Sequence, residues 1–194
     1  MIRYVASILV LVLVAVIVQQ FLPALTALSG SRILPVALVF LCAAVTLPPP
    51  GMLLLAFVCG FLTDLENWIG PHGGDPAIYQ FPVETLRFGY SIILYGVMGM
   101  LMQGIRPLFR RGNWQLSALL AGIAVFLYLT SEFLLINFIR GGFSFGSRTL
   151  MKISLSSALT TLFAPLVFWI LFALAERFHY TIRLDTQRRR PGES

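Results

Sequence analysis

The stretch "LPPPGMLLLAFVCGFLTDL", Leu47 to Leu65, holds the features that decide the fold of this chain. Its three prolines lack backbone N–H donors and do not continue a helix, so one helix must end before them and another begin after them. An apolar segment follows the prolines and runs into the carboxylate Asp64. The first question is therefore which solvent surrounds an apolar segment that ends on a charge.

The composition of the whole chain answers that question in favour of a lipid bilayer. Of its 194 residues, 58% are hydrophobic and only 11% are charged, whereas soluble domains carry about 25% charged residues. The mean hydropathy is +0.86. Cys42 and Cys59 lie inside apolar runs, where free thiols behave as small hydrophobes, so we expect no disulfide, metal site or other cofactor.

Apolar runs of the length needed to cross a membrane recur along the chain. A spanning helix needs about 20 mainly apolar residues for a hydrocarbon core of about 30 Å. We predict an all-α integral membrane protein, a bundle of about six transmembrane helices. The predicted spans are 5–22, 33–47, 52–65, 88–104, 116–136 and 153–175, which form one transmembrane domain over residues 1–176.

Three of these spans leave an alternative open. Val5 to Leu22 has the form of a secretory signal, but its apolar run is long for one, so we favour an uncleaved anchor. Ile33 to Leu47 and Met52 to Leu65 are both short. They are either two compact helices joined by a tight turn or a re-entrant pair that turns back inside the membrane.

The distribution of basic residues predicts the orientation. An even number of spans places both termini on one side. Nine basic residues fall on that side: Arg3, Arg106, Arg110, Arg111, Arg177, Arg183, Arg188, Arg189 and Arg190. Five fall on the other: Arg32, Arg87, Arg140, Arg148 and Lys152. Because an excess of Lys and Arg marks the cytoplasmic side, we expect both termini and the basic tail, residues 177–194, to be cytoplasmic. The charge suits anionic head groups, and we expect no nucleic-acid partner.

Asp64 is the first candidate for a functional residue. At helical rise it lies about 20 Å into its span, near the outer edge of the hydrocarbon. In one interpretation Asp64 ends the helix and is wetted by head groups or loop water. In the other it faces the bundle and takes a partner such as Arg87, because an unpaired carboxylate in the membrane is costly.

Glu132 is the second candidate, because it lies near the outer end of the fifth predicted span in "LYLTSEFLLINFIR". A lone charge there is expensive. Glu132 either reaches the surface or pairs with Arg140 or Lys152, or else contacts a polar group on the spanning helix of another protein.

Small residues recur at spacings that suit close helix packing. The pairs are Ala56 with Gly60, Gly89 with Gly96, Ala118 with Gly122, Ser154 with Ala158, and Ser157 with Thr161. Spacing of four residues, or of seven for Gly89 and Gly96, places both members on one helix face and lets backbones approach. We expect most of these faces to pack inside the bundle.

One segment has the spacing of a hydrolase nucleophile turn, "GFSFG", Gly142 to Gly146. Ser144 would need a strand-to-helix turn and a histidine base within reach. His72 and His179 belong to other segments, on different sides of the predicted membrane. We therefore predict that the chain is not an enzyme.

The opening stretch resembles the central signature of the bacterial rod shape-determining protein family MreD. In that family a proline-started helix of Leu, Ala and Gly closes with an aspartate and a leucine. Gly60, Asp64 and Leu65 match those motif positions. The resemblance implies a helical bundle similar in plan to the substrate-binding subunits of vitamin ECF transporters.

The same resemblance implies a function and a set of partners. The chain would be a non-enzymatic scaffold or regulator in the bacterial inner membrane, controlling cell shape within the cell-wall elongation complex. Its implied partners are MreC, the MreB filament, the glycan polymerase RodA and a class B penicillin-binding transpeptidase.

The rival hypothesis is a solute-binding subunit of a transporter. Asp64, Trp68, Glu84 and Arg87 would then contact a vitamin-sized ligand beneath the outer loops. Against this hypothesis, the sequence shows no clustering of aromatic and polar residues inside several spans.

Overall fold

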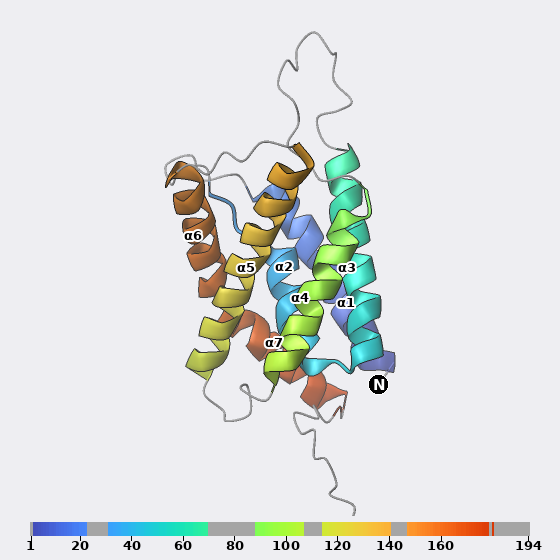
Figure 1. Cartoon of the computed structure of the whole chain (residues 1–194). Coiled ribbons are helices and arrows are strands. Elements are labelled where there is room, and N and C mark those ends of the chain that lie inside the picture. The colour runs from blue at the N-terminus through green and yellow to red at the C-terminus, as the bar shows by residue number, and fades with distance from the viewer. Residues whose placement is uncertain are drawn as a thin grey trace, which may run out of the picture.

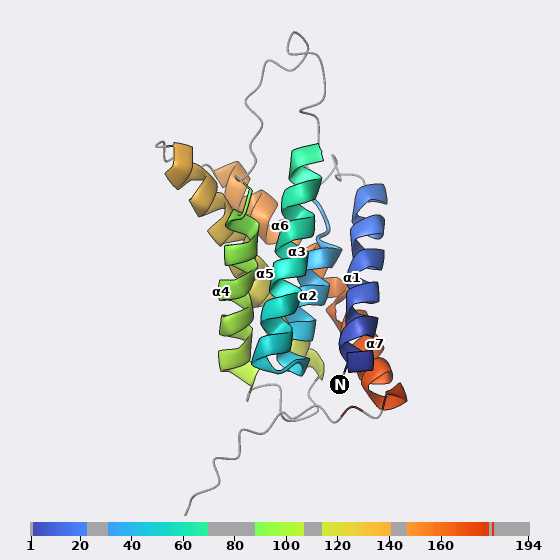
Figure 2. The same ribbon diagram turned by 90° about the vertical axis from the view of Figure 1, so that its right-hand side faces the viewer.

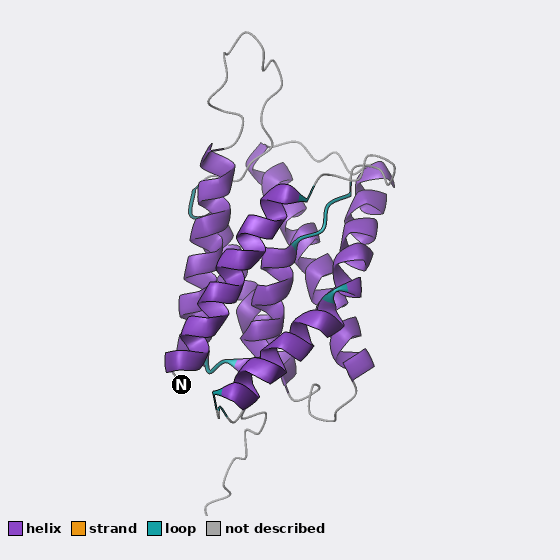
Figure 3. Cartoon of the chain, turned by 180° about the vertical axis from the view of Figure 1, so that it is seen from behind, coloured by secondary structure: helices purple, strands orange, loops and turns teal. Residues whose placement is uncertain are grey.

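The described part of the chain is entirely helical (Figure 1). A computed structural model describes residues 2–22, 31–69, 88–106, 114–140, 147–178 and 180. Within these ranges there are seven helices and no strand, as the colouring of Figure 3 makes plain. The helices are α1 (Ile2–Phe21), α2 (Pro35–Thr46), α3 (Pro49–Ile69), α4 (Tyr90–Ile105), α5 (Trp114–Arg140), α6 (Ser147–Leu162) and α7 (Ala164–Arg177). The all-α prediction is confirmed.

Three helices are long and apolar enough to cross a membrane. They contain the segments Arg3–Phe21, Pro49–Glu66 and Ser117–Phe138, and the bent pair of α6 and α7 adds a fourth if it counts as one span. Apolar side chains on α1, α3 and α5 are exposed at their outer surfaces, among them Val10, Phe57 and Ile123. These features are those of a membrane protein, in which lipid covers apolar side chains.

The third helix is longer in the structure than the predicted span 52–65. Helix α3 begins at Pro49, inside the proline run, and has 21 residues. Proline is tolerated in the first helical turn, where its missing N–H would have no partner. The prolines therefore separate α2 from α3 and also start α3.

Helix α2 lies in the middle of the bundle and contacts all six of the others (Figures 1 and 2). Every residue from Val36 to Thr46 is buried. A helix that is hydrophobic all round packs inside a protein, and α2 is surrounded by protein and not by lipid. With 12 residues it is about 18 Å long, shorter than the hydrocarbon core.

Close contacts between helix backbones occur where the small residues lie. A Cβ added to Gly60 of α3 would lie within 3.0 Å of the backbone of Ser91 and Ile92 on α4. A Cβ at Gly122 of α5 would meet Thr161 of α6, whose neighbour Ser157 donates a hydrogen bond to the Gly122 carbonyl oxygen at 2.9 Å. These positions pack inside the bundle, as predicted, whereas Ser154 and Ala158 on α6 are exposed.

The sixth predicted span, residues 153–175, is not one straight helix. It is broken at Phe163 into α6 and α7, which are bent by 40°. Pro165 is in the first turn of α7. It has no N–H for the Thr161 carbonyl, and its ring would clash with that carbonyl in a continuous helix. The proline therefore accounts for the break.

The start of α1 and the end of α7 lie at the same end of the bundle, which we call the terminal end (Figures 1 and 2). The Tyr4 and Tyr180 rings stack there, 4.4 Å apart between centroids. Tyr4 donates a hydrogen bond to the Thr46 side-chain oxygen at 3.0 Å. Side chains from the first helix and from beyond the last one thus hold the C-terminus of α2.

One further side chain closes this end of α2. The Gln103 side-chain nitrogen donates to the carbonyl oxygens of Ala44 and Leu47, each at 2.8 Å. Last-turn carbonyls have no partner within their own helix, so these bonds satisfy two groups that would otherwise be unpaired. Burial lowers the pKa of the Arg106 guanidinium, whose Nε is buried without a hydrogen-bond partner among the described residues.

Candidate functional site

Asp64 is inside the bundle and not at the end of its helix. Its side chain is 2% exposed, and α3 continues past it to Ile69. The interpretation in which Asp64 ends the helix and is wetted is therefore wrong. A helix end near Asp64 was expected because the apolar run stops there, but a neighbouring helix covers the carboxylate.

The carboxylate of Asp64 is bound to the beginning of α4. The Gly89 backbone nitrogen donates to Asp64 Oδ2 at 2.6 Å. Gly89 is the N-cap of α4 and has φ 98°, a left-handed conformation that favours glycine. A negative charge is stabilised at a helix N-terminus by the unpaired N–H groups and by the helix dipole.

This contact gives the family-like motif residues a physical role in the packing of α3 against α4. Gly60 and Asp64 are one turn apart on the same face of α3, and Gly60 lets α4 approach closely. That approach brings the α4 N-terminus within reach of the carboxylate. Leu65 is partly buried beside them.

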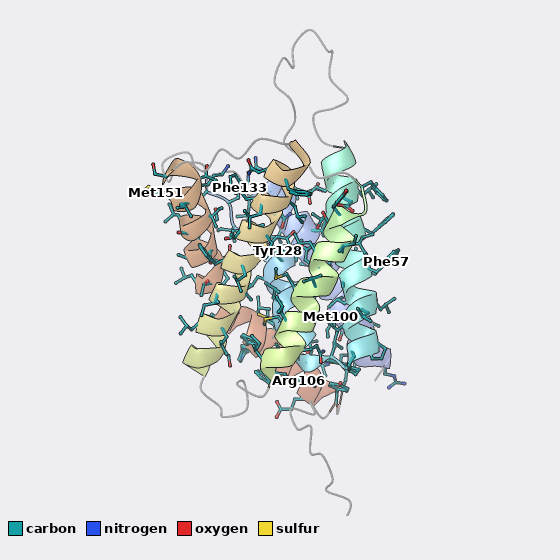
Figure 4. The ribbon with its side chains drawn as sticks, viewed as in Figure 1. Phe57, Met100, Arg106, Tyr128, Phe133 and Met151 are labelled. Carbon is teal, nitrogen blue, oxygen red and sulfur yellow. The ribbon has the colours of Figure 1, made fainter. Side chains whose placement is uncertain are left out.

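Polar side chains from three helices gather around Asp64, and we call this set the polar cluster. It comprises Thr63 and Asp64 of α3, Tyr95 of α4, and Tyr128 and Glu132 of α5. The Tyr95 and Tyr128 rings are 5.1 Å apart between centroids. The Thr63 hydroxyl donates to the Tyr95 oxygen at 3.4 Å. Figure 4 places Tyr128 on the side of α5 that faces α4.

Glu132 joins the cluster from one turn beyond Tyr128 on α5. It interacts electrostatically with both Tyr95 and Tyr128, and Asp64 also interacts with Tyr128. Glu132 is partly buried, on the same face of α5 as Tyr128. Lys152 is exposed on α6, and the predicted pairing of Glu132 with Lys152 or Arg140 stays a prediction. The side chain of Arg140 lies outside the described residues.

Several residues singled out in the sequence are not covered by the structure. Arg87 and Glu84 lie outside the described residues, as does the "GFSFG" segment, and so does the side chain of Trp68. The predicted pairing of Asp64 with Arg87 stays a prediction. Among the side chains that are described, no group of three His, Cys, Asp or Glu is placed to hold a metal ion.

The sequence analysis missed Tyr95 and Tyr128. Both lie in apolar helices and look like ordinary packing residues. The signal that identifies them is their helical spacing to polar positions: Ser91 is four residues before Tyr95, and Glu132 four after Tyr128. The structure thus brings aromatic and polar side chains of several helices together inside the bundle. The sequence alone shows no such clustering.

A groove of about 630 Å³ opens between α4 and α5. It is lined by Tyr90, Ile93, Leu94, Val97 and Met98 of α4 and by Ser131, Leu134, Leu135 and Phe138 of α5. Ile93 and Phe138 are 65% and 79% exposed, so the groove opens on the outside of the bundle, where lipid would lie. Nothing lies within 4 Å of a Cβ added to Gly96, on the same helix as Ile93 and Val97.

Comparison with known proteins adds no assignment to this geometry. No protein-family model matches the chain, and neither a curated protein nor a solved structure matches it.

Proposed function

We propose that the chain is a non-enzymatic membrane scaffold of the bacterial cell-wall elongation complex. It would control cell shape by binding MreC and the wall-synthesis proteins through its transmembrane helices. The resemblance of Leu47–Leu65 to the MreD signature names the complex, and the groove between α4 and α5 is the observation that supports helix binding.

The groove has the chemistry that a spanning helix needs. Its lining is apolar apart from Tyr90 and Ser131, so it matches the side chains of a lipid-exposed helix. Association of helices in lipid depends on packing and on hydrogen bonds between helices, because lipid is as apolar as the helices themselves. Ser131 supplies such a hydroxyl, and the bare backbone at Gly96 allows close approach.

Cysteine crosslinking tests this proposal directly. Single cysteines at Ile93 and Phe138 lie in the groove, whereas cysteines at Met100 and Leu119 are exposed on the same two helices but outside it. Cys42 and Cys59 are both 0% exposed and give no background. In native membranes we expect the groove positions to crosslink to MreC and the control positions not to.

Two results would contradict the proposal. Equal crosslinking at groove and control positions would remove the groove from the interface. Failure of every position to capture MreC or a wall synthase, in cells that stay rod-shaped without the protein, would remove the scaffold function.

The orientation is part of the same proposal. We place both termini in the cytoplasm and the protein in the inner membrane, since the helix ends that carry the chain termini share one end of the bundle and the basic residues favour that side. A reporter fused to either terminus should be active only in the form that reports cytoplasmic location.

One observation favours the solute-binding subunit as a second candidate. The polar cluster puts two tyrosines and the Asp64 carboxylate inside the bundle, near the end at which α4 begins. Native mass spectrometry of the purified protein decides between the two candidates: a vitamin-sized molecule that stays bound favours transport.

A further inference from the structure

The groove between α4 and α5 contains a hydroxyl group without a hydrogen-bond partner. Ser131 lines the groove, and its hydroxyl makes no hydrogen bond to any of the described residues. A serine or threonine inside a helix commonly bonds to the carbonyl oxygen four residues before it. The neighbouring Thr130 does so, with its hydroxyl 2.8 Å from the Phe126 carbonyl oxygen. The Ser131 hydroxyl is therefore available to another molecule in the groove.

The depth of Ser131 decides which kind of molecule can meet this hydroxyl. α4 begins and α5 ends at the same end of the bundle, opposite the terminal end (Figures 1 and 2). The apolar segment of α5 runs to Phe138, and Ser131 is seven residues, or about 10 Å, before it. At that depth a bilayer offers neither water nor head groups. A lipid chain in the groove would leave the hydroxyl unpaired, whereas a protein helix can bring a polar side chain to it.

The groove is short compared with the membrane. Its lining extends from Tyr90 to Met98 on α4 and from Ser131 to Phe138 on α5. At helical rise these segments are about 12 Å and about 10 Å long, against a hydrocarbon core of about 30 Å. A helix that crosses α4 and α5 at an angle makes a contact of this length. The occupant would therefore touch the groove over about two turns, in the half of the membrane where α4 begins.

We propose that the groove binds a spanning helix that carries one neutral hydrogen-bonding side chain, an amide or a hydroxyl, and that this side chain pairs with Ser131. The inference rests on the proposed scaffold function and specifies the chemistry of the partner. A charged side chain is excluded from this role because its transfer into hydrocarbon is costly. Hydrogen bonds between helices in membranes are modest, so the pairing should favour a polar helix over an apolar one by about threefold to tenfold.

Designed single-span helices test this chemistry with defined probes. Three probes share a leucine-rich span, basic residues at the cytoplasmic end to fix the orientation, and one cysteine on the side where the reporter fusions locate Phe138. The first probe is leucine throughout. The second carries one asparagine about 10 Å from the Phe138 side, and the third carries it about 10 Å from the opposite side. Each is co-expressed in a bacterial membrane with the full chain carrying Phe138→Cys, and disulfide crosslinking is measured after addition of an oxidant.

The second probe should crosslink about threefold to tenfold more than the leucine probe, and the third should not exceed the leucine probe. Ser131→Ala should abolish this gain, whereas Ser131→Thr, which keeps a hydroxyl, should retain it. Thr130→Ala is the matched control, because the Thr130 hydroxyl is bonded within its own helix, and it should also retain the gain. Met151→Cys, exposed on α6 at the same end of the bundle (Figure 4), sets the background.

Two kinds of result would overturn the proposal, and they separate it from the scaffold function. If the gain survives Ser131→Ala, or if all three probes crosslink equally well above the Met151→Cys background, the groove accepts a helix but makes no polar contact through Ser131. The scaffold function would then stand without this inference. If no probe crosslinks above that background, the groove does not bind a helix, and both this inference and the helix binding proposed for the scaffold fail.

Discussion

The packing of α3 against α4 predicts that Gly60→Ala destabilises the bundle. The new Cβ would be 2.6 Å from the Ile92 backbone nitrogen and 2.9 Å from the Ser91 carbonyl carbon. These are backbone atoms, which do not rotate away as a flexible side chain does. To restore an ordinary contact of 3.4 Å or more, the two helices must separate locally by about 1 Å.

Two contributions set the size of the effect. Overpacking of a well-packed contact costs about 1–3 kcal/mol. The separation also stretches the 2.6 Å hydrogen bond from Gly89 to Asp64, and hydrogen bonds to charged groups contribute about 1.5–3 kcal/mol. Because the two contributions share one displacement, we expect a total of about 3 kcal/mol, or a fall of about 6–12 °C in unfolding temperature.

Gly96→Ala on α4 is the matched control, since nothing lies within 4 Å of its added Cβ. Alanine favours a helix over glycine by up to about 1 kcal/mol, so this variant should be as stable as the natural chain or slightly more so. The assay is thermal unfolding of both variants in one detergent. Equal unfolding temperatures for Gly60→Ala and Gly96→Ala would refute the close approach of α3 and α4.

Two further predictions concern the terminal end of the bundle. Gln103→Leu should lower the free energy of unfolding by about 2 kcal/mol, because it leaves the buried carbonyls of Ala44 and Leu47 unpaired. Denaturant titration measures this loss. An unchanged unfolding midpoint would contradict both hydrogen bonds. Tyr180→Ala should lower the free energy of unfolding by about 1 kcal/mol, because it removes the ring stacked on Tyr4. Tyr180→Phe should be nearly neutral, since the hydroxyl contact to the Thr46 carbonyl is long at 3.4 Å. A larger loss of stability in the Phe variant would show that the hydroxyl matters more than the ring.

The apolar helices followed from the sequence because hydrophobicity and helix length are properties of the chain itself. The burial of α2 inside the bundle was harder to predict from the sequence. Its sequence "PVALVFLCAAVT" is apolar on every side, which equally describes a helix in lipid and a helix buried in protein. Its 12 residues were the clue, since a helix too short for the hydrocarbon is better covered by other helices.

The break at Phe163 shows a different limit. Pro165 stands in "TLFAPLVFW", and its missing N–H was visible in the sequence. Apolar composition on both sides made one continuous span the simpler prediction. Prolines do occur in spanning helices when other groups satisfy the freed carbonyls, so the residue alone does not distinguish a kink from a break.

The candidate site was predicted only in part. Asp64 and Glu132 stood out because charges are rare in apolar segments, and both are in the polar cluster. The burial of Asp64 depends on contacts between residues far apart in the chain, which no local pattern encodes. Tyr95 and Tyr128 carried no such signal, because tyrosine is common in packed helices.

The two ends of the bundle differ in how completely they are joined, and this difference bears on where function resides. At the terminal end, hydrogen bonds and a ring stack tie α1, α2, α4 and Tyr180 together. Toward the opposite end, α4 and α5 part to form the groove. Buried polar atoms without a hydrogen-bond partner occur at both ends, Asp64 Oδ1 here and Arg106 Nε at the terminal end, so the two ends differ in packing alone. Departures from complete packing persist mainly where function requires them. The terminal end therefore holds the helices in register, and the proposed partner helix would bind where α4 begins.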